Sequence, residues 1–78
     1  MTIRTLIVDD EPLARRGLEL RLQGAADITI VRQCANGREA IAAIAELDPD
    51  LMFLDIQMPG LSGLEVVAQV PQESMPMV

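Results

Sequence analysis

Three apolar stretches alternate with helical patterns along the chain, and each stretch predicts a strand. Ile3 to Val8 and Ile28 to Cys34 are rich in β-branched residues, while Leu51 to Leu54 is apolar without a break. The mixed polarity of Ile28 to Cys34 is typical of a strand at a sheet edge, and the unbroken third stretch suits a strand covered on both faces.

Helical patterns follow each predicted strand. Pro12 is suited to a first helical turn, and the helix that it begins is predicted to run to about Gln23. Its apolar arc comprises Leu13, Ala14, Gly17, Leu18, Leu20 and Leu22, and Arg21, which lies inside this arc, is expected to reach outward to water. Arg15 and Arg16 fall on the opposite side, which predicts solvent exposure.

A second helix is predicted from Glu39 to Leu47, although Asn36-Gly37 could instead form a hairpin turn. Ser62 and Glu65 have the spacing of a capping box for a third helix, which must end by Pro71. Strands that alternate with helices in this order predict right-handed crossovers, a parallel sheet and an α/β fold.

Acidic residues stand where two of the predicted strands end. Asp9 and Asp10 follow Val8, and Asp55 follows Leu54. The carboxyl ends of parallel strands face the crevice where open α/β sheets bind ligands, and three carboxylates gathered there would repel one another unless a cation or protons neutralised them. This pattern predicts a metal site. Alternatively, Asp55 only begins a turn, and the Asp9–Asp10 pair only complements a helix dipole.

Three ordered segments resemble the receiver domain of two-component response regulators. They are Leu6 to Pro12 (LIVDDEP), Ala35 to Ala40 (ANGREA) and Pro49 to Glu65 (PDLMFLDIQMPGLSGLE). The amino-acid sequences of the first and third segments are most similar to those of regulators of the LytTR type, which carry a DNA-binding output domain after the receiver.

The resemblance implies a flavodoxin-like fold with strand order 2-1-3-4-5. We expect residues 1–78 to be a partial receiver that stops after the third β-α unit, with Pro76 to Val78 beginning the fourth strand. Strands four and five and any output domain would be absent. Receivers carry a Ser or Thr after strand four and a Lys after strand five, whereas all six basic residues of this chain are Arg. The third strand would become an open edge that invites self-association.

The resemblance also implies the chemistry. Asp55 would be the phosphoacceptor that receives a phosphoryl group from the histidine of a sensor kinase. Asp9, Asp10, Asp55 and the backbone carbonyl of Gln57 would bind Mg²⁺. The domain would be a signalling module, not an enzyme with substrate turnover. Arg15 and Arg16 lie on the helix where receivers meet the kinase, so they could contact it.

The remaining conspicuous residues are expected to have structural roles. Glu11 is expected to stabilise the helix start, Arg38 to lie in solvent, and Cys34 to be a small core residue. Pro59, Gly60 and Gly63 would shape a loop, and the methionines show no ligand pattern.

Composition limits the function classes. The net charge of −6 disfavours direct DNA binding by these residues, so DNA would be bound through an output domain. A single Cys and the lack of a recognisable leader favour the cytoplasm. No apolar run approaches the roughly 20 residues of a membrane span. With only 1% aromatic residues, the core must be aliphatic, and a domain of this size buries about 60% of its unfolded surface.

Two other functions fit parts of the pattern. A haloacid-dehalogenase-like phosphatase also forms an aspartyl phosphate, but it needs a second Asp where this chain has Gln57, and it needs a Lys. A pure interaction module would use the open sheet edge and leave the acidic cluster without a chemical role.

Overall fold

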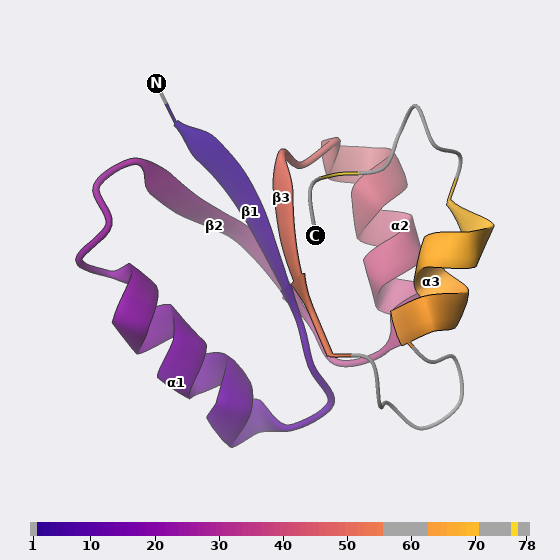
Figure 1. The fold of residues 1–78 in the computed structure, drawn as a ribbon, viewed down its shortest axis with the longest axis horizontal. Helices are drawn as coiled ribbons and strands as arrows, with labels where there is room; N and C mark the ends of the chain where they lie inside the picture. Colours follow the sequence, from indigo (N-terminus) through magenta and orange to yellow (C-terminus); the bar gives the residue numbers. More distant parts are fainter. Residues whose placement is uncertain (1, 56–62, 71–75, 77–78) are drawn as a thin grey trace.

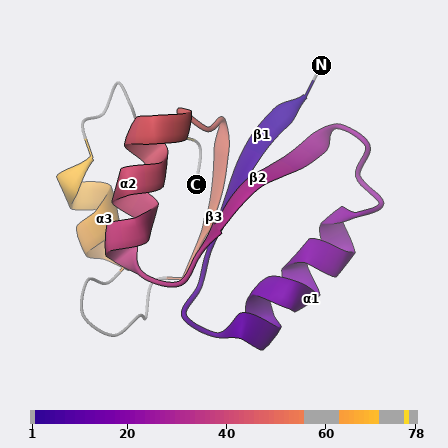
Figure 2. The same cartoon turned by 180° about the vertical axis from the view of Figure 1, so that it is seen from behind.

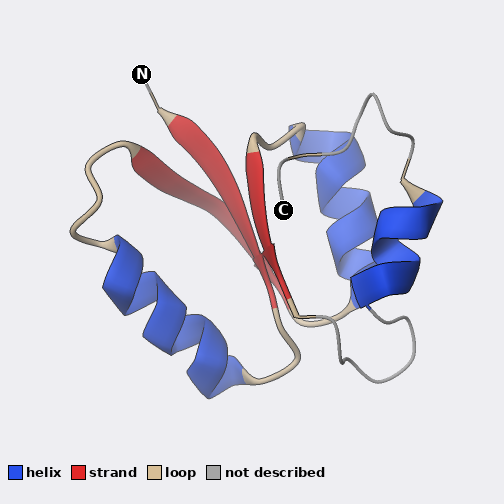
Figure 3. Cartoon of the chain, in the orientation of Figure 1, coloured by secondary structure: helices blue, strands red, loops and turns tan. Residues whose placement is uncertain are grey.

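The computed structural model describes residues 2–55, 63–70 and 76, and the predicted alternation of strands and helices is confirmed there (Figures 1 and 3). The elements, in chain order, are β1 (Ile3–Val8), α1 (Pro12–Leu22), β2 (Ile28–Cys34), α2 (Gly37–Leu47), β3 (Leu51–Leu54) and α3 (Gly63–Gln69). The end of α3 at Gln69 agrees with the prediction that this helix stops before Pro71.

The sheet is parallel and has the order β2-β1-β3. In the register of β1 with β3, Leu6 lies opposite Met52 and Val8 lies opposite Leu54, so the two strands end side by side. Strand β2 occupies one edge, as its mixed polarity predicted, and β3 occupies the other edge of the sheet formed by the described residues. The three strands have the order that the resemblance to receivers predicted, and parallel strands with helices on both faces form the predicted α/β, flavodoxin-like arrangement.

Helices cover the two faces of the sheet unequally. Figure 1, and the reverse view in Figure 2, show α1 on one face and both α2 and α3 on the other. The hydrophobic core lies on the side of α2 and α3, because alternate residues of a strand point to opposite faces. Its buried members are Leu6, Val8, Cys34, Ala40, Ala43, Ile44, Met52, Val66 and Val70.

Helix α1 is covered far less than its apolar arc suggested. None of its residues is buried, Leu13 is 84% exposed and Leu20 is 50% exposed. Only the inner part of the arc, represented by Leu18 and Leu22, is partly covered. The reason is that α1 lies on its face of the sheet with no second described helix beside it (Figure 1).

The start of α2 corrects the sequence prediction. The helix begins at Gly37, two residues before Glu39, and the hairpin alternative for Asn36-Gly37 is wrong. The Asn36 side chain accepts a hydrogen bond from the Glu39 N–H at 2.9 Å, and the Glu39 carboxylate accepts one from the Ala35 N–H at 2.9 Å. This reciprocal capping satisfies backbone donors that a helix start otherwise leaves free.

The end of α2 is tied to the sheet by Arg4. Its guanidinium donates to the carbonyl oxygens of Leu47 and Asp48. The Asp50 carboxylate accepts from the Arg4 N–H at 2.9 Å, and the Asp50 N–H donates to the Arg4 carbonyl at 2.8 Å. Because the last carbonyls of a helix lack helical partners, this contact both caps α2 and fixes where β3 begins.

Several predictions concern residues outside the described ranges. They include the cap at Ser62, the loop residues Pro59 and Gly60, the carbonyl of Gln57, and Met77 and Val78. Among the described residues, none of the helices has the length and apolarity needed to cross a membrane.

Candidate metal centre

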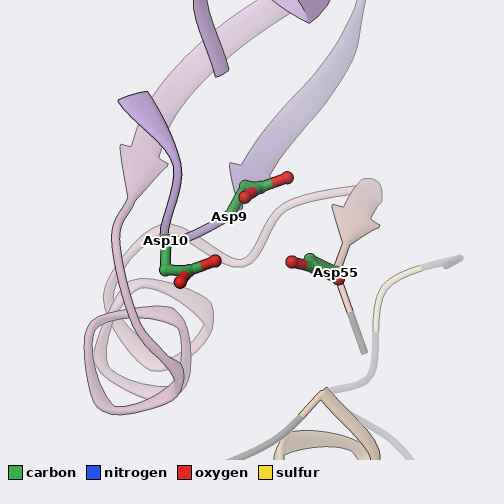
Figure 4. A group of neighbouring side chains, drawn as sticks. All are labelled: Asp9, Asp10 and Asp55. Carbon is green, nitrogen blue, oxygen red and sulfur yellow. The ribbon is translucent and has the colours of Figure 1, made fainter. Parts of the chain in front are cut away.

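Three aspartates converge at the carboxyl edge of the sheet. Asp9 and Asp10 follow β1, and Asp55 follows β3. One carboxylate oxygen from each residue lies within 4.8 Å of the others, and all three residues are half-buried. Figure 4 shows the three side chains around one common space. The predicted meeting of these acids is therefore present in the structure.

Parallel pairing explains why the acids meet. Val8 and Leu54 are register partners, so the residues that follow them leave the sheet at the same level. The Asp55 N–H donates to the Val8 carbonyl at 3.0 Å, which extends the ladder by one bond and anchors the backbone of Asp55. Two chain segments that are far apart in sequence thus present carboxylates to one site.

Asp9 is held at three points. Its N–H donates to the Cys34 carbonyl at 3.0 Å, and its Oδ1 accepts from the Glu11 N–H at 2.9 Å. Its carbonyl oxygen accepts from Arg15 Nη1 at 2.6 Å. These contacts leave Oδ2 of Asp9 without a donor among the described residues, so this oxygen is available to a cation.

Arg15 corrects another prediction. The helical pattern predicts solvent exposure for both Arg15 and Arg16, and only Arg16 lies in solvent: its side chain is 62% exposed and pairs with Glu19 at 2.7 Å. Arg15 is half-buried and reaches back to Asp9 across the first turn of α1. Long helical side chains point toward the amino terminus of their helix, and this direction was the available signal.

The chemistry of the donor set fits a hard divalent cation. Carboxylate oxygens are the preferred ligands of Mg²⁺ and Ca²⁺, and three of them at this spacing repel one another without a counter-charge. A cation bound here would relieve that repulsion.

A cavity of about 400 Å³ adjoins the acids, between α1 and the sheet. Its lining combines the Asp9 and Asp55 region with an apolar wall that consists of Ile7, Ala14, Leu18, Phe53 and Leu54. The sequence alone does not predict this cavity, because its shape depends on how α1 lies over β1 and β3.

Cys34 lies at the end of β2, next to the site, and is fully buried. Burial, with a smaller contribution from the Glu39 charge, raises the pKa of its thiol to about 11. The thiol is therefore protonated at neutral pH and is a poor nucleophile and metal ligand. This agrees with the prediction of a small core residue.

A family model of the response regulator receiver domain matches residues 5–78. The chain belongs to the response regulator receiver family. The transcriptional regulatory protein BtsR of Salmonella typhi is 57% identical over 76 residues, which make up 97% of this chain and 32% of that protein. The chain thus spans about a third of the length of this relative. Because the chain belongs to the receiver family, the haloacid-dehalogenase alternative is set aside.

Solved structures agree with the family. The response regulator domain of Thermotoga maritima CheB has a TM-score of 0.89 and 32% identity, with 99% of this chain and 57% of that chain covered. A LuxR-family response regulator from Aurantimonas has a TM-score of 0.79 and 30% identity, with 85% of this chain and 47% of that chain covered. Receivers are signalling domains of two-component systems, so the chain is a signalling module of this kind.

Proposed function

We propose that this receiver chain is a phosphoacceptor module in which Asp55 takes a phosphoryl group from the phosphohistidine of a sensor kinase. The observation that carries the proposal is the convergence of Asp9, Asp10 and Asp55 within 4.8 Å at the carboxyl edge of the sheet. Of these acids, Asp55 alone comes from β3, and it stands opposite the other two across the shared space (Figure 4).

The transfer balances as a displacement at phosphorus. A carboxylate oxygen of Asp55 forms the new P–O bond, the P–N bond to the donor imidazole breaks, and the imidazole leaves with the bonding electron pair. The product is an acyl phosphate on Asp55. Charge accumulates on the phosphoryl oxygens beside an already acidic cluster, so the site needs a counter-charge.

Asp9, Asp10, Asp55 and the backbone carbonyl of Gln57 are the proposed ligands of Mg²⁺, and Gln57 lies outside the described residues. A bound Mg²⁺ would neutralise the charge that the carboxylates and the phosphoryl oxygens bring together. The three-point attachment of Asp9 supports this role, because ligands that are fixed before binding lose little freedom on binding.

The test is phosphorylation of the 78-residue chain with acetyl phosphate and Mg²⁺, followed by intact-mass spectrometry. We expect one added phosphoryl group, loss of the adduct in Asp55→Ala, and loss when EDTA replaces Mg²⁺. Asp27→Ala is the matched control, because it removes an exposed acid away from the cluster. A folded chain that gains no phosphoryl group, or an adduct that persists in Asp55→Ala, contradicts the proposal.

We propose that residues 1–78 are a partial receiver, that strands four and five and an output domain belong to the longer parent, and that the parent works in the cytoplasm. Through its output domain the parent would bind DNA and regulate transcription. The LytTR-type output stays a prediction, and a LuxR-type output is the alternative because a LuxR-family regulator is among the matching structures.

The edge position of β3 in the sheet of the described residues favours a second function for the chain by itself. Within the described residues β3 pairs only with β1, so its other side can receive a strand from a second copy. We expect self-association, measured by size-exclusion chromatography with light scattering. A monomer at all concentrations, with unchanged phosphorylation, would leave the phosphoacceptor role intact and reject this second function.

A further inference from the structure

Two neighbouring arginines of α1 differ in their surroundings. Arg16 lies in solvent and pairs with Glu19 one turn along the helix, at 2.7 Å. Arg15 is half-buried, and its Nη1 donates to the Asp9 carbonyl at 2.6 Å. The same residue type therefore faces water at one position and the acidic site at the next.

The carbonyl that Arg15 holds belongs to the peptide group between Asp9 and Asp10. A peptide group is planar, so a hydrogen bond to its oxygen restrains rotation of the peptide plane about the line that joins the Cα atoms of the two residues. Because this plane flanks both Cα atoms, its orientation restrains the direction in which each of them projects its side chain. Arg15 thus acts on both carboxylates through one hydrogen bond to the backbone.

The other contacts of this turn depend on the same plane. The Asp9 N–H is bound to Cys34 and its Oδ1 to the Glu11 N–H, which together hold the residue from the other side. No donor from the described residues reaches the Asp10 carboxylate. The backbone hydrogen bond from Arg15 is consequently the contact that restrains Asp10 from its amino-terminal side.

We propose that Arg15 is a positioning residue for the acidic site. Through its hydrogen bond to the Asp9 carbonyl it orients the carboxylates of Asp9 and Asp10 to bind a divalent cation, and it does not contact the cation itself. The inference rests on the proposed Mg²⁺-dependent phosphoacceptor role. Partners that orient metal ligands from outside the coordination sphere change metal affinity by about 10-fold to 100-fold when removed.

Positioning and simple electrostatics predict opposite results. Arg15 is a positive charge near a cation site, so its removal should tighten Mg²⁺ binding if only charge mattered. If the hydrogen bond to the Asp9 carbonyl orients the ligands, its removal should weaken binding despite the gain in negative charge. The sign of the change therefore separates the two effects.

The experiment is isothermal titration of MgCl₂ into the 78-residue chain and its variants at one ionic strength. Arg15→Met keeps the apolar stem and removes both charge and donors, and Arg16→Met removes the same charge from the exposed neighbour. We expect Arg15→Met to bind Mg²⁺ about 10-fold more weakly and Arg16→Met to bind as the unsubstituted chain or slightly more tightly. Arg15→Lys, which keeps a donor, should recover part of the lost affinity.

Equal or tighter Mg²⁺ binding by Arg15→Met than by Arg16→Met would overturn the inference and leave the proposed function standing. An unsubstituted chain that is folded and binds no Mg²⁺ would overturn the proposed function and the inference with it. Circular dichroism checks that each variant is folded. If Arg15→Met unfolds, all variants are titrated in a stabilising osmolyte, so that the comparison is again made between folded chains.

Discussion

Replacing Asp10 with Asn should make the metal-free chain more stable while it impairs the site. The Asp10 carboxylate lies within 4.8 Å of oxygens from both Asp9 and Asp55. The substitution keeps the shape of the side chain and removes one negative charge. It therefore removes two of the three pairwise repulsions in the cluster.

The magnitude follows from Coulomb's law. Two unit charges at this separation repel by about 1 kcal/mol in the dielectric constant of bulk water, and by more where protein displaces water. Two lost pairs contribute about 2 kcal/mol. Asp10 also precedes α1, so the lost interaction with the helix dipole offsets about 0.3 to 1 kcal/mol. The net gain of about 1 kcal/mol or more should raise the Tm by about 4 to 8 °C for each kcal/mol.

Thermal unfolding followed by far-ultraviolet circular dichroism measures this gain. Asp27→Asn is the matched control, because it makes the same change of net charge at an exposed turn. In EDTA we expect Asp10→Asn to melt above both the unsubstituted chain and the control. With increasing Mg²⁺ the unsubstituted chain should gain stability by mass action, while Asp10→Asn should gain much less.

Salt provides a second criterion. Raising the ionic strength from about 0.01 M to about 1 M shortens the screening length from about 30 Å to about 3 Å, so the advantage of Asp10→Asn should shrink. An Asp10→Asn chain that is no more stable than Asp27→Asn without metal would show that repulsion among the three carboxylates does not lower the stability of the chain. So would an advantage that is the same at both salt concentrations, because the gain would then not arise from charge repulsion.

Three further predictions concern stability. Arg4→Ala should lower the free energy of unfolding in urea by about 1.5 to 3 kcal/mol, because the substitution removes a charged donor to the last carbonyls of α2. Arg38→Ala, which removes an exposed Arg, is the control and should leave the free energy of unfolding nearly unchanged. Asn36→Ala should cost about 1 kcal/mol through loss of the helix cap, and an unchanged urea midpoint would contradict the capping role. Burial raises the pKa of the Cys34 thiol to about 11, so the unfolded chain loses the thiol proton at a lower pH than the folded chain does. The free energy of unfolding should therefore be constant below about pH 9 and fall by on the order of 2 kcal/mol toward about pH 11. The chain has no Lys or Tyr to titrate in that range, so Cys34→Ala should abolish the decline; a decline of equal size in Cys34→Ala would count against it.

Much of the fold was accessible to sequence reasoning because its signals are local. The apolar runs, Pro12 at a helix start and the breaks at Asp48-Pro49 define elements whatever the rest of the chain does. The start of α2 was also a local signal, since Asn36 and Glu39 have capping spacing, but the predicted start at Glu39 followed the Ala- and Ile-rich pattern and so fell two residues late.

The chain order of the strands is part of the sequence, but which strands are neighbours is not. The sheet order and the role of Asp55 came from the resemblance to receivers, and the structure brings β1 and β3 together so that their terminal acids meet. The sequence alone predicts acids at strand ends. Only the pairing of the strands decides which acids share a site.

By itself, the sequence determined the alternating elements, the aliphatic core and the positions of the acids at the ends of strands. The tertiary structure decided that Arg15 turns toward Asp9, that Leu13 stays exposed and that a cavity opens between α1 and the sheet. The physical reason is that helical periodicity assigns a residue to a side of its helix, whereas the crossing of that helix over the sheet determines which atoms meet each side.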